Sequence, residues 1–181
     1  TPNATNNPAF PQIRVTINEF MARNDRTEAD PADNDFEDWF ELHNAGTNSV
    51  DLTSYTLTDV LTNANEFVIP PGYVIPPGGF LLVWADSETG QNRATNIDLH
   101  VSFKLNSTNG VIGLFSPDGA LVDSVPYGQQ TNDLSMGRFP DGAAPPLFEM
   151  ETPTPRKANL LAGANRPPTL NPIAGRTNAE Q

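Results

Sequence analysis

The chain has 181 residues, enough for one domain with flanking segments. Its 22 acidic and 10 basic side chains give a formal net charge of −12, and a surface of this sign repels a phosphate backbone, so we expect no nucleic-acid partner. The lack of cysteine excludes thiol catalysis and cysteine-bound zinc, and no apolar run reaches the roughly 18 residues of a membrane helix, so we expect no direct membrane insertion.

Short apolar or alternating segments, separated by turn residues, run through most of the chain. Residues 1–12 are polar and punctuated by proline, and we interpret them as a linker; residues 21–37 are polar and acidic and predict a long loop. Period-two alternation or a continuous apolar run predicts strands at residues 14–20, 38–44, 50–52, 56–58, 66–69, 80–85, 99–105, 111–115, 121–125 and 135–139.

Turn chemistry predicts a hairpin across residues 116–120, where Pro117 presets φ, Asp118 caps the turn and Gly119 takes the left-handed position. The connections are too short for crossover helices, which predicts antiparallel pairing. No segment supports an amphipathic helix, so the pattern predicts an all-β sandwich or barrel. The predicted core includes Val15, Ile17, Phe40, Leu42, Leu57, Leu82, Phe103, Ile112 and Leu114.

Several segments, taken in order, resemble the lamin tail domain family. The matching pieces are INEF at 17–20, DWFELHN at 38–44, LTSYTLTD at 52–59, IPPGGFLLVWAD at 75–86, FKLNSTNGVIGL at 103–114, SMGR at 135–138 and TPRKAN at 154–159. The resemblance implies an immunoglobulin-like antiparallel β-sandwich. It is closest to the bacterial type of this domain, which occurs as a module within large exported proteins.

The sequence also departs from that family. Nuclear lamins add a coiled-coil rod and a prenylation signal, whereas this chain has no heptads and no cysteine. Arg156 stands where the family's tail sometimes has glycine. Residues 165–177 resemble the first strand of a cadherin-like or immunoglobulin-like module, with a plain proline-rich tail as the alternative. We therefore expect a linker at 1–12, the lamin-tail-like sandwich at 13–159, and a linker with the truncated start of a following module at 160–181.

The motifs of common enzymes are missing from the sequence. It has no Gly-x-Ser-x-Gly elbow, no His-Glu-x-x-His and no phosphate-binding glycine loop before a helix. His43 is predicted at a strand end on the outer face, and we interpret both His43 and His100 as surface or packing residues. Paired carboxylates for glycoside hydrolysis are the one catalytic chemistry that the many acids leave open. We expect no catalytic residues and no bound organic cofactor.

Two binding functions remain, a protein-interaction or adhesion module and a carbohydrate- or polymer-binding module that targets an attached enzyme. The second depends on exposed aromatic side chains that stack on sugars, for which Trp39, Tyr55, Tyr73 and Trp84 are candidates. Trp84 lies in an apolar run and is predicted in the core, whereas Trp39 alternates away from Phe40 and is predicted at the surface. We expect the fragment to be monomeric and to lie outside the cell or on its surface, with a protein or polysaccharide partner.

Acidic residues concentrate in the predicted loop before the second strand. Nine of the 22 acids lie between Glu19 and Glu41. The spacing of Asp33, Asp35 and Glu37 imitates the start of an EF-hand loop, but Asp38 stands where glycine makes the sharp turn and no helices flank it. We predict Asp33, Asp35 and Asp38 as ligands of Ca²⁺. The alternative is a solvated acidic loop that contributes to solubility.

The tail supplies the first testable prediction. Residues 160–181 carry three prolines and few bulky apolar side chains, so we expect them to lie outside the sandwich core. Truncation after Gly163 is expected to leave the melting temperature nearly unchanged. A fall of more than about 5 °C, measured by thermal unfolding, contradicts this, because it corresponds to a loss on the order of 1 to 2 kcal/mol.

Overall fold

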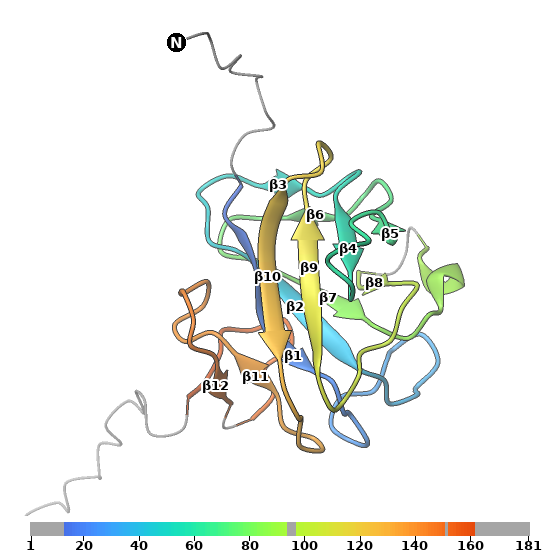
Figure 1. Ribbon diagram of the computed structural model, residues 1–181, viewed down its shortest axis with the longest axis vertical. Helices are drawn as coiled ribbons and strands as arrows, with labels where there is room; N and C mark the ends of the chain where they lie inside the picture. Colours follow the sequence, from blue (N-terminus) through green and yellow to red (C-terminus); the bar gives the residue numbers. More distant parts are fainter. Residues whose placement is uncertain (1–12, 94–96, 151, 162–181) are drawn as a thin grey trace, which may run out of the picture.

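Two β-sheets pack face to face over a shared apolar core (Figure 1). The structure is a computed structural model and describes residues 13–93, 97–150 and 152–161. The larger sheet has the strand order β12 (Phe148–Glu149), β11 (Met136–Gly137), β1 (Val15–Met21), β2 (Trp39–Asn44), β7 (Phe80–Trp84), β8 (Leu99–His100). The smaller sheet has the order β10 (Leu121–Tyr127), β9 (Gly110–Phe115), β4 (Thr56–Thr58), β5 (Phe67–Val68).

The remaining elements are small. A two-stranded ribbon joins β3 (Val50–Asp51) to β6 (Val74–Ile75), and one 3-10 turn, η1 (Thr89–Gln91), is the only helical element among the described residues. None of the helical structure in that part of the chain is long and apolar enough to cross a membrane. The all-β, immunoglobulin-like sandwich predicted from the sequence is confirmed, although β6 and β12 were not predicted.

A β-bulge in β1 decides which side chains face the core. The register against β2 shifts between Ile17 and Glu19, so one extra residue, Asn18, interrupts the alternation. As a result Phe20 joins the shared core with Ile17, and Glu19 is turned to the opposite face. The Asn18 side chain is held in place by Asp141, which accepts from Nδ2 at 2.9 Å, and by the Gly142 amide, which donates to Oδ1 at 2.9 Å.

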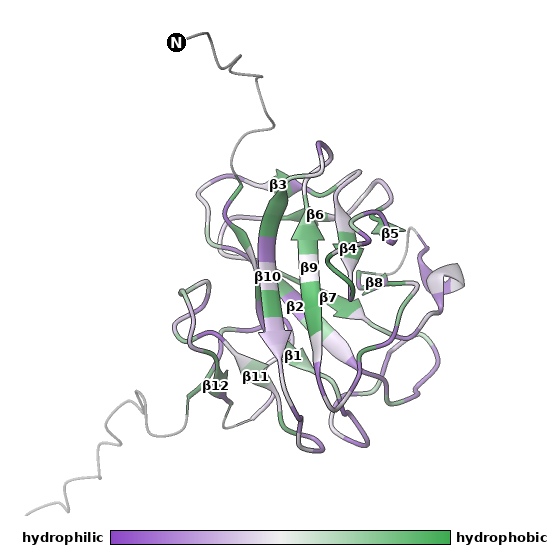
Figure 2. Cartoon of the chain, in the orientation of Figure 1, coloured by the Kyte–Doolittle hydropathy of each residue, from purple (hydrophilic) through white to green (hydrophobic). Residues whose placement is uncertain are grey.

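The hairpin between β9 and β10 forms as its turn residues predict. The Ser116 amide donates to the Ala120 carbonyl at 2.9 Å, and the Gly119 amide to the Ser116 carbonyl at 2.8 Å. Gly119 has a φ of +81°, in the left-handed region that favours glycine. Figure 2 shows hydrophobic and hydrophilic bands along β10, which lies over the larger sheet.

One strand pair contradicts the prediction of antiparallel pairing. β8 runs parallel to β7, with Val83 opposite Leu99 and Trp84 opposite His100, and the Val101 amide donates to the Trp84 carbonyl at 3.0 Å. The segment 85–98 carries the chain back alongside the end of β7, and η1 is the one helical element among its described residues. This crossover brings residues near His100 to the end of β7.

The predicted core residues are all buried, and all but Leu82 belong to the cluster shared by the two sheets. Leu82 lies in a second cluster with Met21, Trp39 and Trp84. Because neighbouring residues of a strand face opposite ways, Phe40 and Leu42 turn toward the smaller sheet while Trp39 and Glu41 turn away from it. We call this second side of the larger sheet the outer face; β7 is therefore buried on both sides, as its continuous apolar run predicts.

The prediction of a surface-exposed Trp39 is wrong, and the four candidate aromatic residues form no exposed platform. Trp39 and Trp84 have no exposed area, and Tyr55 and Tyr73 are 5% and 9% exposed. Trp39 does alternate away from Phe40, but the outer face is covered by other parts of the chain, so facing away from the core does not expose it. His43, predicted on the outer face, lies there but is buried, with its ring 4.7 Å from that of Phe80.

Candidate functional site

The outer face carries two buried carboxylates. Glu19 and Glu41 are neighbours across β1 and β2, and neither side chain is accessible to solvent. Burial raises the pKa of Glu19 and raises that of Glu41 to about 9, although hydrogen bonds from the chain oppose the shift in both. One oxygen of Glu41, Oε1, has no hydrogen-bond partner among the described residues.

Residues 152–161, here called the C-terminal segment, bind these two carboxylates. The Thr154 amide donates to Glu19 Oε1 at 3.1 Å and its hydroxyl to Oε2 at 2.7 Å, while Ser135 Oγ donates to Oε1 at 2.5 Å. The Arg156 amide donates to Glu41 Oε2. These bonds join strand residues to positions more than a hundred residues later in the chain. The bound segment explains why the Glu19 and Glu41 side chains are inaccessible to solvent.

Gly137 and Arg138, in the SMGR motif, complete this attachment. A Cβ at Gly137 would lie 2.5 Å from Asn159 Nδ2 and 3.0 Å from the Asn18 carbonyl, so the close approach requires glycine. Asn159 Nδ2 donates to the carbonyls of Arg138 and Asn18 at 2.8 and 3.2 Å. The Arg138 guanidinium binds both oxygens of Asp123 on β10, at 2.9 and 3.0 Å, which ties the two sheets together.

Arg156 occupies a backbone conformation that usually favours glycine. Its φ is +63°, in the left-handed region, which gives the physical reason for glycine at this position in the resembling family. In return, the side chain makes ion pairs that glycine lacks. The guanidinium binds Asp98 through Nε at 3.1 Å and Glu28 through Nη1 at 3.1 Å, and Asp98 also accepts from the Trp84 indole at 3.3 Å.

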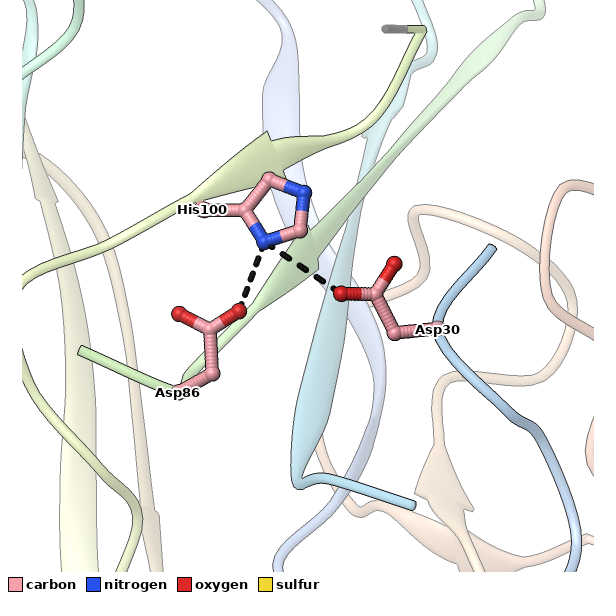
Figure 3. Close-up of side chains that lie close together, drawn as sticks. All are labelled: Asp30, Asp86 and His100. Atoms are coloured by element: carbon pink, nitrogen blue, oxygen red, sulfur yellow. Dashed lines mark hydrogen bonds and ion pairs between the residues drawn. The ribbon is translucent and has the colours of Figure 1, made fainter. Parts of the chain in front are cut away.

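An acidic cluster lies where the loop between β1 and β2 meets the ends of β7 and β8. Asp30, Asp86 and His100 are all buried, and their ligand atoms lie within 4.8 Å of one another. His100 Nδ1 is 2.6 Å from Asp86 Oδ2 and 3.6 Å from Asp30 Oδ2, and Figure 3 shows both carboxylates pointing at this one ring nitrogen. Asp30, Asp33 and Glu37 form a second group within 4.8 Å, sharing Asp30 with the first.

Burial and neighbouring charges shift the pKa values of the side chains in this cluster. Burial and the nearby charges of Asp86, Glu88 and Asp33 raise the pKa of Glu37 to about 7, and burial likewise raises the pKa of Asp30. For His100, burial by itself favours the neutral ring, but the hydrogen bond and charge of Asp86 outweigh it, so the pKa is raised. The imidazolium form therefore suits its two carboxylate neighbours.

The three acids predicted as Ca²⁺ ligands fall in different places. Asp33 belongs to the second group, where Gln91 Nε2 donates to its Oδ2 at 2.7 Å. Asp35 is exposed and contributes its backbone, since its carbonyl accepts from the Asp30 amide at 2.9 Å. Asp38 accepts from the Asn24 amide at 3.2 Å, and burial raises its pKa to about 6. Neither Asp35 nor Asp38 is in a metal-competent group among the described residues.

Sequence reasoning missed Asp30, Asp86 and His100 as members of one site. Asp30 and Glu37 belong to the acidic run noticed in the sequence, so their proximity to Asp33 was within reach of spacing arguments. Asp86 and His100 come together only because β8 returns parallel to β7, which the turn signals did not predict. The other histidine, His43, is in neither group, and burial lowers its pKa.

An apolar groove lies beside the end of β10, and none of its lining residues belongs to the acidic cluster. It has a volume of about 420 Å³ and is lined by Phe20, Val125, Tyr127, Leu134, Met136 and Leu147, among others. Phe20 and Tyr127 pack with ring centroids 4.8 Å apart. Glu149 is the one charged residue among those lining the groove.

These features define an immunoglobulin-like β-sandwich with an apolar groove and an acidic cluster. The sequence model of the Lamin Tail Domain family matches residues 8–129, more than half of the chain. The chain belongs to this family, whose members are non-enzymatic immunoglobulin-like protein-interaction domains.

A search of curated proteins found no match to the chain. The match to the family model confirms the predicted resemblance to a lamin tail domain for residues 8–129. The cadherin-like resemblance of residues 165–177 lies outside both the matched and the described residues and stays a prediction. β11 and β12 extend the larger sheet beyond the matched range.

The conformation of Arg156 yields a prediction about two substitutions. Arg156→Ala and Arg156→Gly both remove the ion pairs with Asp98 and Glu28, but only glycine relieves the left-handed backbone. We expect the glycine variant to be more stable than the alanine variant by about 1 kcal/mol, measured by urea unfolding. An alanine variant as stable as the glycine variant would show that the backbone here is not strained.

The burial of Glu41 yields a prediction about pH. A carboxyl whose pKa is about 9 in the folded chain and near 4.5 when unfolded keeps its proton in the folded state, so stability falls as pH rises through this window. We expect the parent to lose about 2 to 4 kcal/mol more than Glu41→Gln between about pH 5 and pH 8, because each pH unit in this window contributes up to about 1.4 kcal/mol.

Urea unfolding at the two pH values measures this difference. Glu149→Gln, which removes an exposed glutamate on the same sheet, is the matched control and is expected to follow the parent. If Glu41→Gln and the parent show the same pH dependence, Glu41 is ionised in the folded protein and our account of the outer face is wrong.

Proposed function

We propose that this chain is a non-catalytic interaction module of a larger exported bacterial protein, and that it binds an extended apolar segment of a partner protein in the groove beside β10. The observation that carries the proposal is the position of that groove. β10 ends the strand order of the smaller sheet, so among the described strands its outer edge has no hydrogen-bonded neighbour. An unpaired edge next to apolar pockets is the arrangement used in strand addition.

Contacts already made by β10 limit where a partner fits. Asp123, near the middle of the strand, accepts from the Ile17 amide at 2.8 Å and binds Arg138, so this part of the edge is occupied. Residues 124–127, beyond it, line the groove. Pro126 has no amide hydrogen, so a partner strand must form its backbone hydrogen bonds with the residues next to Pro126. A short extended segment with alternate apolar side chains meets these conditions.

Charge favours a basic partner segment. Glu149 is exposed and contributes the only charge among the lining residues, and the whole chain carries a net charge of −12. A lysine or arginine beside the apolar residues of the segment would pair with Glu149 and be drawn by the overall field. Carbohydrate binding, the alternative function, loses its support because Trp39, Tyr55, Tyr73 and Trp84 are all buried.

Export is supported by the resemblance to bacterial modules and is part of the same proposal. Labelling of intact source cells with a membrane-impermeant reagent tests it, and a parent protein that is labelled only after lysis would contradict it. A role in adhesion follows if the partner is itself a surface protein.

Binding to a library of short random peptides tests the groove. We expect the selected peptides to share alternating apolar residues with a flanking basic residue, and Leu134→Asp or Leu147→Asp to abolish their binding, because each places a charge among apolar lining residues. Val68→Asp is the matched control, because Val68 is an exposed apolar residue on β5, the other edge strand of the same sheet.

Reversal of the rim charge sharpens this test. Glu149→Lys is expected to change the selected flanking residue from basic to acidic. Peptides that bind all variants equally, or that lose binding only in Val68→Asp, would place the interaction elsewhere. As a control, amide NMR spectra of each variant show whether the sandwich is still folded.

A further inference from the structure

Two carboxylate oxygens of the acidic cluster are buried without a hydrogen-bond donor among the described residues. Asp30 is 1% exposed; its Oδ1 accepts from the Ala32 amide at 2.9 Å, but Oδ2 has no hydrogen-bond partner. Oε2 of Glu37 is in the same position, although the rest of that side chain is partly exposed. A buried acceptor with no donor costs free energy unless something else satisfies it.

The two acids lie together with a third, Asp33. Asp30, Asp33 and Glu37 offer carboxylate oxygens that all lie within 4.8 Å of one another, close enough to contact one ion. Behind Asp30, His100 is engaged by Asp86 at 2.6 Å and reaches Asp30 Oδ2 only at 3.6 Å, beyond hydrogen-bonding distance (Figure 3). The histidine thus offsets part of the local negative charge but leaves Asp30 Oδ2 open.

We propose that Asp30, Asp33 and Glu37 bind a Ca²⁺ ion, and that the Asp86–His100 pair positions Asp30 from behind. The donor set favours a hard cation, because all three proposed ligands are oxygen atoms. Ca²⁺ takes six to eight oxygen ligands in flexible geometry, so backbone carbonyls and water complete a shell that three carboxylates begin. This inference is independent of the groove, which lies elsewhere on the chain.

The loop is already folded into the shape that the site needs. The Asp30 amide donates to the Asp35 carbonyl at 2.9 Å, and the Asn34 amide to the Asp30 carbonyl at 2.8 Å, which closes the turn between the proposed ligands. Gln91 on η1 donates to Asp33, so the site also spans the crossover between β7 and β8. A bound ion would therefore link the loop between β1 and β2 to that crossover.

As a consequence, the occupancy of the acidic cluster would depend on the calcium concentration around the module. Sites in extracellular modules bind Ca²⁺ with dissociation constants of about 10⁻⁴ to 10⁻³ M, which suits millimolar calcium outside a cell. Binding to the folded state alone raises its stability by mass action. We expect the site to be filled, and the loop to be fixed against the crossover, in such surroundings.

Calorimetric titration of the whole chain with CaCl₂ tests the proposal, with thermal unfolding as a second measurement. We expect a dissociation constant of about 10⁻⁴ to 10⁻³ M and a rise in melting temperature. Asp33→Asn and Glu37→Gln are expected to weaken binding by about tenfold or more and to remove the rise. Asp35→Asn is the matched control, in the same loop but outside the ligand set, and is expected to bind within about twofold of the parent.

Three results would overturn the proposal. The first is a parent chain that binds no Ca²⁺ at about 10 mM, ten times the weak limit for such modules. The second is loss of binding in Asp35→Asn with retention in Asp33→Asn, which would place the ion on the exposed side of the loop. The third is preference for Zn²⁺ with loss of binding in His100→Gln, which would assign a nitrogen-containing site at Asp30, Asp86 and His100.

Discussion

The structure depends on two carboxylates buried where a sheet would ordinarily meet solvent. Glu19 and Glu41 lie side by side on the outer face of the larger sheet, and the amides of Thr154 and Arg156, with the Thr154 hydroxyl, donate to three of their four oxygens. Removal of the C-terminal segment would leave Glu41 without its backbone donor and Glu19 with the Ser135 hydroxyl alone, on the face that carries Trp39 and Trp84. The larger sheet is therefore a layer with cover on both sides.

This arrangement also explains how the chain positions its two candidate binding regions. The bulge at Asn18 sends Glu19 outward and Phe20 inward, so one backbone irregularity supplies both the anchor for the C-terminal segment and a wall of the apolar groove. At the other end of the sheet, the parallel return of β8 carries His100 to Asp86 and Asp30. Rigid strands hold both regions, while the residues that would contact ligands lie largely at strand ends and in loops.

The sequence was sufficient for features that depend on near neighbours. Alternation and turn residues predicted β1, β2, β4, β7 and the hairpin with Gly119 at positive φ, because these are local preferences. It failed for Trp39, because the side chain's direction was right but alternation does not show that the outer face is itself buried, with Trp39 packed against Met21, Leu82 and Trp84. The sequence singled out Asp33 in the acidic loop, which lies near Asp30 and Glu37, but the approach of Asp86 and His100 depended on a crossover that no turn signal marked.

Native-state hydrogen exchange at the amides of Thr154 and Arg156 tests the central claim most directly. If Glu19 and Glu41 hold the C-terminal segment as part of the fold, these two amides exchange only through global unfolding, with the same opening free energy as the slowest amides of β1 and β2. Exchange of both amides through a local opening several kcal/mol cheaper than global unfolding would show that the segment is an accessory, and would contradict this account.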